Sequence, residues 1–120
     1  MKRDIETRED LESLLREFYS VATRDEEIGH HFAELDLKTH LTIIVNFWEK
    51  VLFGNPIYFG NPLAVHQTLH EKSPLNLEHF QRWLEIFSQT VDALFAGETA
   101  DNAKLRGKMI AHSLNQNLNS

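Results

Sequence analysis

Apolar side chains recur at helical spacing along almost the whole chain of 120 residues. The first such segment carries them three or four residues apart, on one face of a helix, at Leu11, Leu14, Leu15 and Phe18. Four later segments show the same period, and none alternates between apolar and polar residues as a half-buried strand does. Short stretches with glycine, proline or asparagine separate the segments. The pattern therefore predicts an all-α fold with short connections.

Capping residues predict where these helices begin. Thr7, followed three residues later by Asp10, resembles a capping box. The later N-terminal signals are Thr39, Pro62, Asn76 and Thr99. We expect helices over residues 7–23, 40–53, 62–70, 76–96 and 99–114, with a short turn over 25–32. In the last helix we expect an inward face at Met109, Ile110 and Leu114, and a frayed polar tail over 115–120.

Composition narrows the classes of function. A chain of 120 residues is long enough for one domain, which we take to span 1–120. The absence of cysteine excludes disulfides, thiolate catalysis, iron–sulfur clusters and haem attached through CxxCH. A net charge of −6 argues against a nucleic-acid partner. The amino end lacks the apolar run of a signal peptide, and no stretch approaches the roughly 20 apolar residues of a membrane span. We therefore expect a cytoplasmic protein without membrane contact.

The segment NPLAVHQTLHEKSP raises the question of a metal site. His66 and His70 lie four residues apart and hence on one face of a short helix. A catalytic zinc site needs three protein ligands, however, and HQTLH lacks the glutamate of HExxH. A helical module that binds a metal through both histidines and a non-catalytic interaction bundle stay open as alternatives. Four further histidines are interpreted as surface or hydrogen-bonded residues with no role in binding: His30, His31, His79 and His112.

A single histidine is enough where a porphyrin holds the iron, because the ring then supplies the four equatorial bonds. The pocket needs apolar walls, which the chain offers at Phe18, Phe32, Ile44, Phe47, Trp48, Trp83 and Phe87. It also needs polar donors over the open coordination position, which Tyr19, His40 and Trp83 supply. Helical spacing puts His40, Ile44 and either Phe47 or Trp48 along one side of a helix. Spacing alone does not bring all these residues into one cavity.

Short motifs follow one another along the chain: Phe18-Tyr19, then Asp25, Ile28-Gly29 and Phe32, His40-Leu41, Asn46-Phe47-Trp48, Tyr58, Gly60-Asn61-Pro62-Leu63, His66 and the segment 79–87. In this order and at this spacing, from Leu11 to about Leu114, the chain resembles the truncated haemoglobins, and most of all their third group. The absence of Gly-Gly pairs agrees with that group. One departure concerns the distal entrance, because several relatives have a tryptophan where this chain has Leu37.

The resemblance implies a truncated globin, a two-over-two helical sandwich, that binds haem b without a covalent link. It implies His66 as the iron ligand, and we expect the second ring nitrogen of His66 to donate to a backbone carbonyl, that of Pro62. His70 falls outside the site. The implied ligand-binding residues on the distal side are Tyr19, His40, Ile44 and Trp83. The implied haem contacts are Phe32, His40, Ile44, Phe47, Trp48, Tyr58, His66, Trp83 and Phe87.

The function implied by the resemblance is the binding of O2, NO and similar diatomic ligands at a pentacoordinate iron. A tightly held ligand suits nitric oxide detoxification or peroxidase-like redox chemistry better than oxygen carriage. Turnover would need electrons, and the chain has no GxGxxG nucleotide fingerprint, so we expect a separate reductase. Three roles stay open for His40: it could gate the entry of the ligand, donate a hydrogen bond to it, or coordinate the iron.

Overall fold

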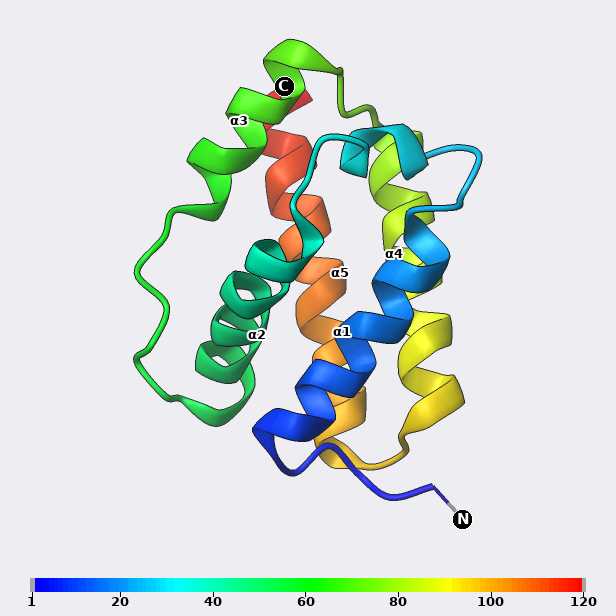
Figure 1. Ribbon diagram of the computed structural model, residues 1–120, viewed down its shortest axis with the longest axis vertical. Helices are drawn as coiled ribbons and strands as arrows, with labels where there is room; N and C mark the ends of the chain where they lie inside the picture. The colour runs from blue at the N-terminus through cyan, green and yellow to red at the C-terminus, as the bar shows by residue number, and fades with distance from the viewer. Residues whose placement is uncertain (1, 120) are drawn as a thin grey trace.

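The structure, a computed structural model, describes residues 2–119. This part of the chain forms five α-helices and one short 3-10 helix: α1 (Arg8–Ala22), η1 (Gly29–Phe32), α2 (Leu37–Phe53), α3 (Pro62–Lys72), α4 (Leu77–Leu94) and α5 (Glu98–Asn119), as Figure 1 shows. No strand occurs between residues 2 and 119, so the all-α prediction is confirmed. Within the same range, no helix is long and apolar enough to cross a membrane.

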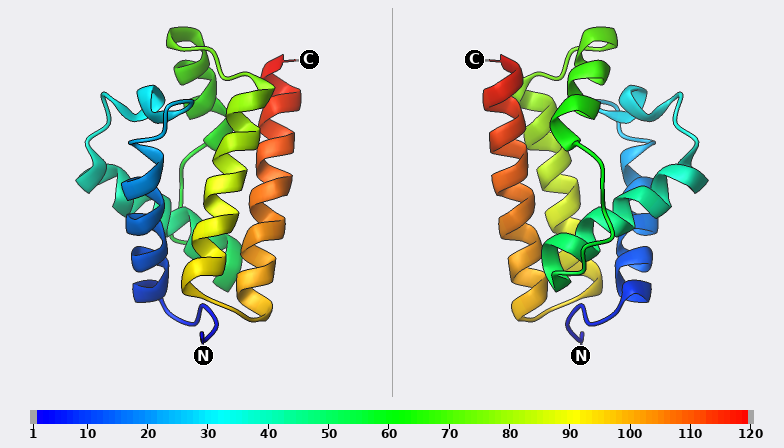
Figure 2. Two further views of the ribbon diagram at one scale, coloured as in Figure 1. Left: turned by 90° about the vertical axis from the view of Figure 1, so that its right-hand side faces the viewer. Right: turned by 90° about the vertical axis from the view of Figure 1, so that its left-hand side faces the viewer.

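The helices form two layers. α1 packs on α2 and on α4, α4 packs on α5, and α2 also contacts α5. Figure 2 shows α4 and α5 running side by side in opposite directions, with α2 crossing them at an angle. α3 lies at the outside of this arrangement and packs on α5. The pair α1–α2 therefore stacks on the pair α4–α5, which is the predicted two-over-two sandwich.

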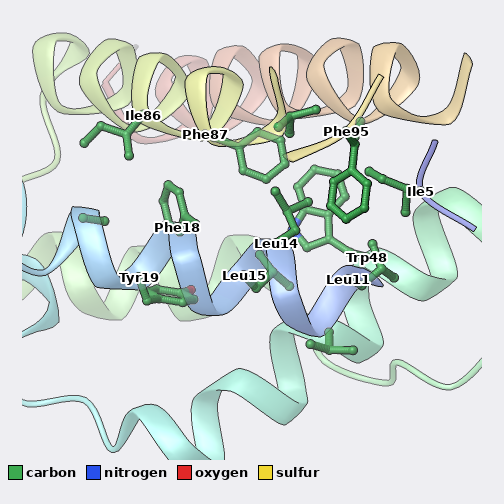
Figure 3. Packing of buried hydrophobic residues seen from close by; sticks show 14 of the residues in the cluster. Ile5, Leu11, Leu14, Leu15, Phe18, Tyr19, Trp48, Ile86, Phe87 and Phe95 are labelled. Atoms are coloured by element: carbon green, nitrogen blue, oxygen red, sulfur yellow. The ribbon is translucent and has the colours of Figure 1, made fainter. Parts of the chain in front are cut away.

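Aromatic rings join three of the helices in the core. Trp48 of α2 stacks on Phe87 of α4 with ring centroids 4.9 Å apart, and Trp83 stacks on the same ring at 5.1 Å. Phe18 of α1 meets Phe87 edge-on at 5.9 Å, an arrangement that aromatic rings favour. Figure 3 shows the side chains of α1 and α4 filling the layer between the two helices. The stack fixes α1, α2 and α4 relative to one another.

Gly107 lets the backbone of α5 approach this stack. A Cβ atom at residue 107 would lie 3.1 Å from Cδ2 of Phe87, closer than ordinary van der Waals contact. Phe87 itself is fully buried. A larger residue at position 107 would therefore require the Phe87 ring or α5 to shift, and this close approach explains the glycine.

Most predicted helix starts are confirmed, and two are wrong: α2 begins before Thr39, and α5 begins at Glu98, one residue before Thr99. Thr7 and Asp10 form the expected capping box, and Asn61 caps α3 with Pro62 in its first turn. α2 begins at Leu37 and not after Thr39. The reason is that the His40 N–H already donates to the Asp36 carbonyl at 2.9 Å, so the first helical turn is closed before Thr39 could act as a cap.

The last helix corrects two further expectations. α5 continues to Asn119, five residues beyond the predicted end at residue 114; fraying of the tail stays a prediction, and Ser120 lies outside the described residues. The Asn119 side-chain amide donates to the Leu75 carbonyl at 2.8 Å, which anchors the helix end. Met109 is 51% exposed and does not face inward, whereas Leu114 is buried. A straight helix buries only one stripe, and the stripe of α5 runs through Gly107, Ala111 and Leu114.

Asp10 is a buried carboxylate with several hydrogen bonds to the N-terminal segment. It is 5% exposed and accepts hydrogen bonds from the Arg3 guanidinium and from the backbone N–H groups of Glu6 and Thr7. These contacts, the Arg3 bond first among them, lower the pKa of Asp10 from 3.8 to about 2. Because the folded state has the lower pKa, the charge of Asp10 stabilises the fold fully above about pH 4, and this stabilisation is lost as the pH falls towards 2.

We therefore predict that Asp10→Asn lowers the free energy of unfolding by about 1–2 kcal/mol at pH 7. The difference from the wild type should shrink as the pH is lowered to 3, because this pH lies between the pKa of Asp10 in the unfolded chain, 3.8, and that in the folded chain, about 2, so part of the stabilisation is already lost. Urea unfolding at the two pH values measures both quantities. Glu9→Gln, at an exposed neighbouring position, serves as the control and should change little. A difference between Asp10→Asn and wild type that stays the same at pH 3 would contradict the account.

Candidate functional site

The predicted site residues differ in depth. Trp48 and Phe87 lie inside the core, with 3% and 0% exposure. The other apolar residues of the set are half-buried and pack on the edge of the same core: Phe32, Ile44, Phe47 and Trp83. The structure therefore arranges the aromatic set as a buried inner part and a half-buried outer part, and only the outer part offers side-chain surface to a bound molecule.

The helix that carries His66 is weakly packed. α3 contains no fully buried residue, and it is attached through Leu63 and Leu69, which contact a small cluster around Phe80 and Leu114. Asn61 caps its start, accepting the Ala64 N–H at 3.2 Å. Helices of this length are marginal in water without tertiary contacts. An additional bond to the core through His66 would therefore stabilise α3.

The ring of His66 is held in one orientation. Its Nδ1 lies 2.6 Å from the Pro62 carbonyl oxygen. A carbonyl only accepts, so Nδ1–H is the donor, and in the neutral ring the lone pair is on Nε2. The contact with Pro62 predicted from the sequence is confirmed. It leaves His66 with one nitrogen ready to bind a metal, in the arrangement that metal-binding histidines commonly show.

His70 forms a hydrogen bond with the loop between α3 and α4. Its Nδ1 accepts the backbone N–H of Leu75 at 2.9 Å and so closes the loop between α3 and α4. In the neutral ring the proton is then on Nε2, which has no lone pair to offer. His66 and His70 share a helix face, as their spacing predicts, but only His66 presents a free ring nitrogen. The geometry argues against a metal site built from the pair.

Tyr19 of α1 and His40 of α2 form a hydrogen-bonded polar pair. The Tyr19 hydroxyl lies 2.9 Å from His40 Nε2. Burial raises the pKa of Tyr19, so the phenol stays protonated. Burial also lowers the pKa of His40, and the proximity of His66 lowers it further, so His40 is neutral at pH 7.

Edge-to-face contacts position the remaining aromatic residues. Phe32 meets the Tyr19 ring at a centroid distance of 5.5 Å, and Tyr58 meets Phe47 at 5.2 Å. The second contact ties the loop between α2 and α3 to α2. Trp83 is stacked on Phe87 and meets Phe18 edge-on at 5.7 Å, so its ring plane is fixed as well. The structure therefore brings the predicted residues of η1, α2, α4 and the loop together around Tyr19 and the aromatic stack.

A hollow next to Tyr19 was not foreseen from the sequence. It measures about 240 Å³ and is lined by Arg16, Tyr19, Ser20, Thr23, Leu37 and Leu41. Leu37 therefore lies beside Tyr19. The i, i+4 spacing of Leu37 and Leu41 indicates that both side chains lie on one face of a helix. It does not indicate that α1 lies opposite this face.

Comparisons with known proteins agree with this geometry. The sequence model of the family described as bacterial-like globin matches residues 4–116. A group 3 truncated hemoglobin from Campylobacter jejuni is 29% identical over 117 residues, spanning 92% of this chain and 90% of that protein. The crystal structure of a group III truncated hemoglobin from the same species superimposes with a TM-score of 0.87, covering 98% of this chain and 95% of that one. These matches confirm the resemblance and the truncated-globin fold predicted from the sequence.

Proposed function

Because this chain belongs to the bacterial-like globin family, we propose that His66 is its iron ligand and that Tyr19, His40 and Trp83 act on small ligands at the opposite face of a haem. Family membership supports haem-based binding of diatomic ligands in general. The proposal adds the residues, the haem b type and the pentacoordinate resting iron.

The orientation of His66 carries the proposal. With Nδ1–H bound to the Pro62 carbonyl at 2.6 Å, Nε2 has the lone pair that an axial ligand needs. The half-buried aromatic residues suit a flat apolar molecule, and without cysteine the macrocycle would be held non-covalently, as haem b is. The residues present fit this cofactor. When bound, haem supplies an iron with one coordination position open to O2, NO or a similar ligand.

The polar pair decides how strongly such a ligand is held. We propose that His40 Nε2–H donates to the Tyr19 oxygen, which leaves the phenolic proton free to donate to the ligand. The indole N–H of Trp83 is the second donor. Hydrogen bonds to a ligand that carries partial negative charge are worth on the order of 1.5–3 kcal/mol each. Two of them slow ligand release by roughly two or more decades.

The apolar residues of the site have a supporting role. Ile44, Phe32 and Phe47 exclude water from the ligand side, which strengthens the hydrogen bonds from Tyr19 and Trp83. Trp48 and Phe87 lie deeper and position Trp83 through stacking. Two of the nine predicted haem contacts, Trp48 and Phe87, are therefore proposed to act mainly through other side chains.

Slow release favours redox chemistry over oxygen carriage. We propose nitric oxide detoxification or peroxidase-like turnover, with electrons from a separate reductase, since the sequence has no nucleotide-binding fingerprint. A cytoplasmic location stays a prediction. A metal module based on His66 and His70 is the weaker candidate, because the Leu75 N–H occupies the lone pair of His70 Nδ1.

We predict that the full chain takes up one equivalent of haemin with a sharp Soret band, and that His66→Ala abolishes tight retention. The matched control is His70→Ala on the same helix, which should retain haem because His70 faces Leu75. Visible spectra after gel filtration measure retention. Equal retention by His66→Ala and wild type would refute the assignment of His66, and zinc uptake without haem uptake would favour the two-histidine module.

We predict that Tyr19→Phe speeds O2 dissociation by roughly tenfold to a hundredfold, because it removes one donor and keeps the ring. His40→Leu should give a smaller increase, since it removes only the group that orients the Tyr19 hydroxyl. Stopped-flow displacement of O2 by CO measures the rates. Trp83→Phe completes the set: if it alone raises the rate while Tyr19→Phe leaves it unchanged, Trp83 holds the ligand and the proposed role of Tyr19 is wrong.

A further inference from the structure

Three histidines meet at the end of the molecule where η1 approaches α4. His30 and His31 belong to η1, and His79 lies in the first turn of α4. The His31 ring lies 4.0 Å from that of His30 and 4.7 Å from that of His79, measured between centroids. One ring nitrogen from each residue lies within 4.8 Å of the other two. This group shares no residue with the proposed haem site.

We propose that His30, His31 and His79 form a second metal site, for a divalent ion of the zinc, nickel or copper type. Three imidazoles without a carboxylate suit these ions, whereas magnesium and calcium require oxygen ligands. Three protein ligands also leave a fourth position for water or another small ligand.

His31 is prepared for this role. It is 7% exposed, and its Nε2 lies 3.2 Å from the Pro74 carbonyl, to which Nε2–H donates. The lone pair is therefore on Nδ1. A histidine that is neutral and anchored to a backbone carbonyl is the usual form of a metal ligand.

The rings have to move closer for a metal to bind. Around one zinc ion with bonds of about 2.0–2.1 Å, ligand nitrogens lie about 3.4 Å apart. The widest separation in the cluster is 4.8 Å or less. His30 is exposed and free to rotate towards the other two, so the closure requires mainly the movement of a surface side chain.

The hydrogen bond from Asn76 to His79 opposes metal binding and should weaken the affinity for the metal. The Asn76 N–H donates to His79 Nδ1 at 3.0 Å, which places the proton of the neutral ring on Nε2. A metal at Nε2 displaces that proton, and the ring then needs a proton at Nδ1, so the bond from Asn76 has to break. Metal binding therefore competes with the N-terminal cap of α4, and we expect a weaker affinity than that of structural zinc sites.

The test is calorimetric titration of Zn²⁺ into the full chain, without an affinity tag and loaded with one equivalent of haem, so that His66 is already engaged. Wild type should bind one Zn²⁺ per chain, and His30→Gln should reduce the affinity at least tenfold. The matched control is His112→Gln, which also removes an exposed histidine but lies on α5, and it should bind as wild type does. His30 is exposed, so its replacement leaves the fold intact.

A second measurement reports on the hydrogen bond between Asn76 and His79 at the start of α4. Saturating Zn²⁺ should speed hydrogen exchange at the Asn76 amide, because the bond to His79 breaks. The proposal is overturned if His30→Gln binds Zn²⁺ as tightly as wild type, if His112→Gln loses as much affinity as His30→Gln, or if wild type shows no saturable uptake. Wild type and variants are compared at the same haem loading, and titrating the same chains without haem repeats the comparison where haem is not taken up, so the failure of either proposal is recognised separately.

Discussion

The stack of Trp48, Phe87 and Trp83 is the interaction on which the rest of the molecule depends. It joins α2 to α4, and Phe18 adds α1 from the side. All the proposed ligand-binding residues, Tyr19, His40, Ile44 and Trp83, lie on these three helices. Because aromatic side chains bury large areas and pack in few orientations, the three helices are held as a rigid frame. The positions of the polar groups in the site follow from that frame.

The helix that carries His66 stands in contrast to this frame. α3 has no fully buried residue and touches mainly α5, yet its His66 ring is held firmly by the Pro62 carbonyl. The local orientation of the ligand atom is thus fixed within α3 itself, while the attachment of α3 to the core is weak. A bond from His66 to a cofactor in the core would hold α3 in place. The free energy of cofactor binding would then add to the free energy of folding.

Local features could be predicted from the sequence because they depend on residues close together in the chain. The Thr7 capping box, the start of α3 at Pro62 and the contact between His66 and Pro62 each join residues no more than four positions apart. The start of α2 was mistaken because Asp36 and Thr39 are both good caps, and only the backbone distinguishes them. Helical periodicity indicates which side chains face inward but not how deeply each is buried. It therefore did not distinguish the buried Trp48 and Phe87 from the half-buried residues around them.

Long-range contacts could not be predicted in this way. Nothing in the spacing of His30, His31 and His79 indicates that η1 reaches the start of α4. The contact of Asn119, the last residue of α5, with the Leu75 carbonyl joins residues far apart in the chain in the same way. Likewise, Tyr19 and His40 were predicted as polar donors from their side chains and from the family resemblance, but their hydrogen bond depends on how α1 packs on α2.

The central claim is that one imidazole, that of His66, holds the iron while the opposite face stays open. A crystal structure of the haem-loaded chain tests it most directly. The account predicts iron bonded to Nε2 of His66, with Nδ1 still on the Pro62 carbonyl and Tyr19 on the other side of the macrocycle. Iron held by any other side chain would contradict it.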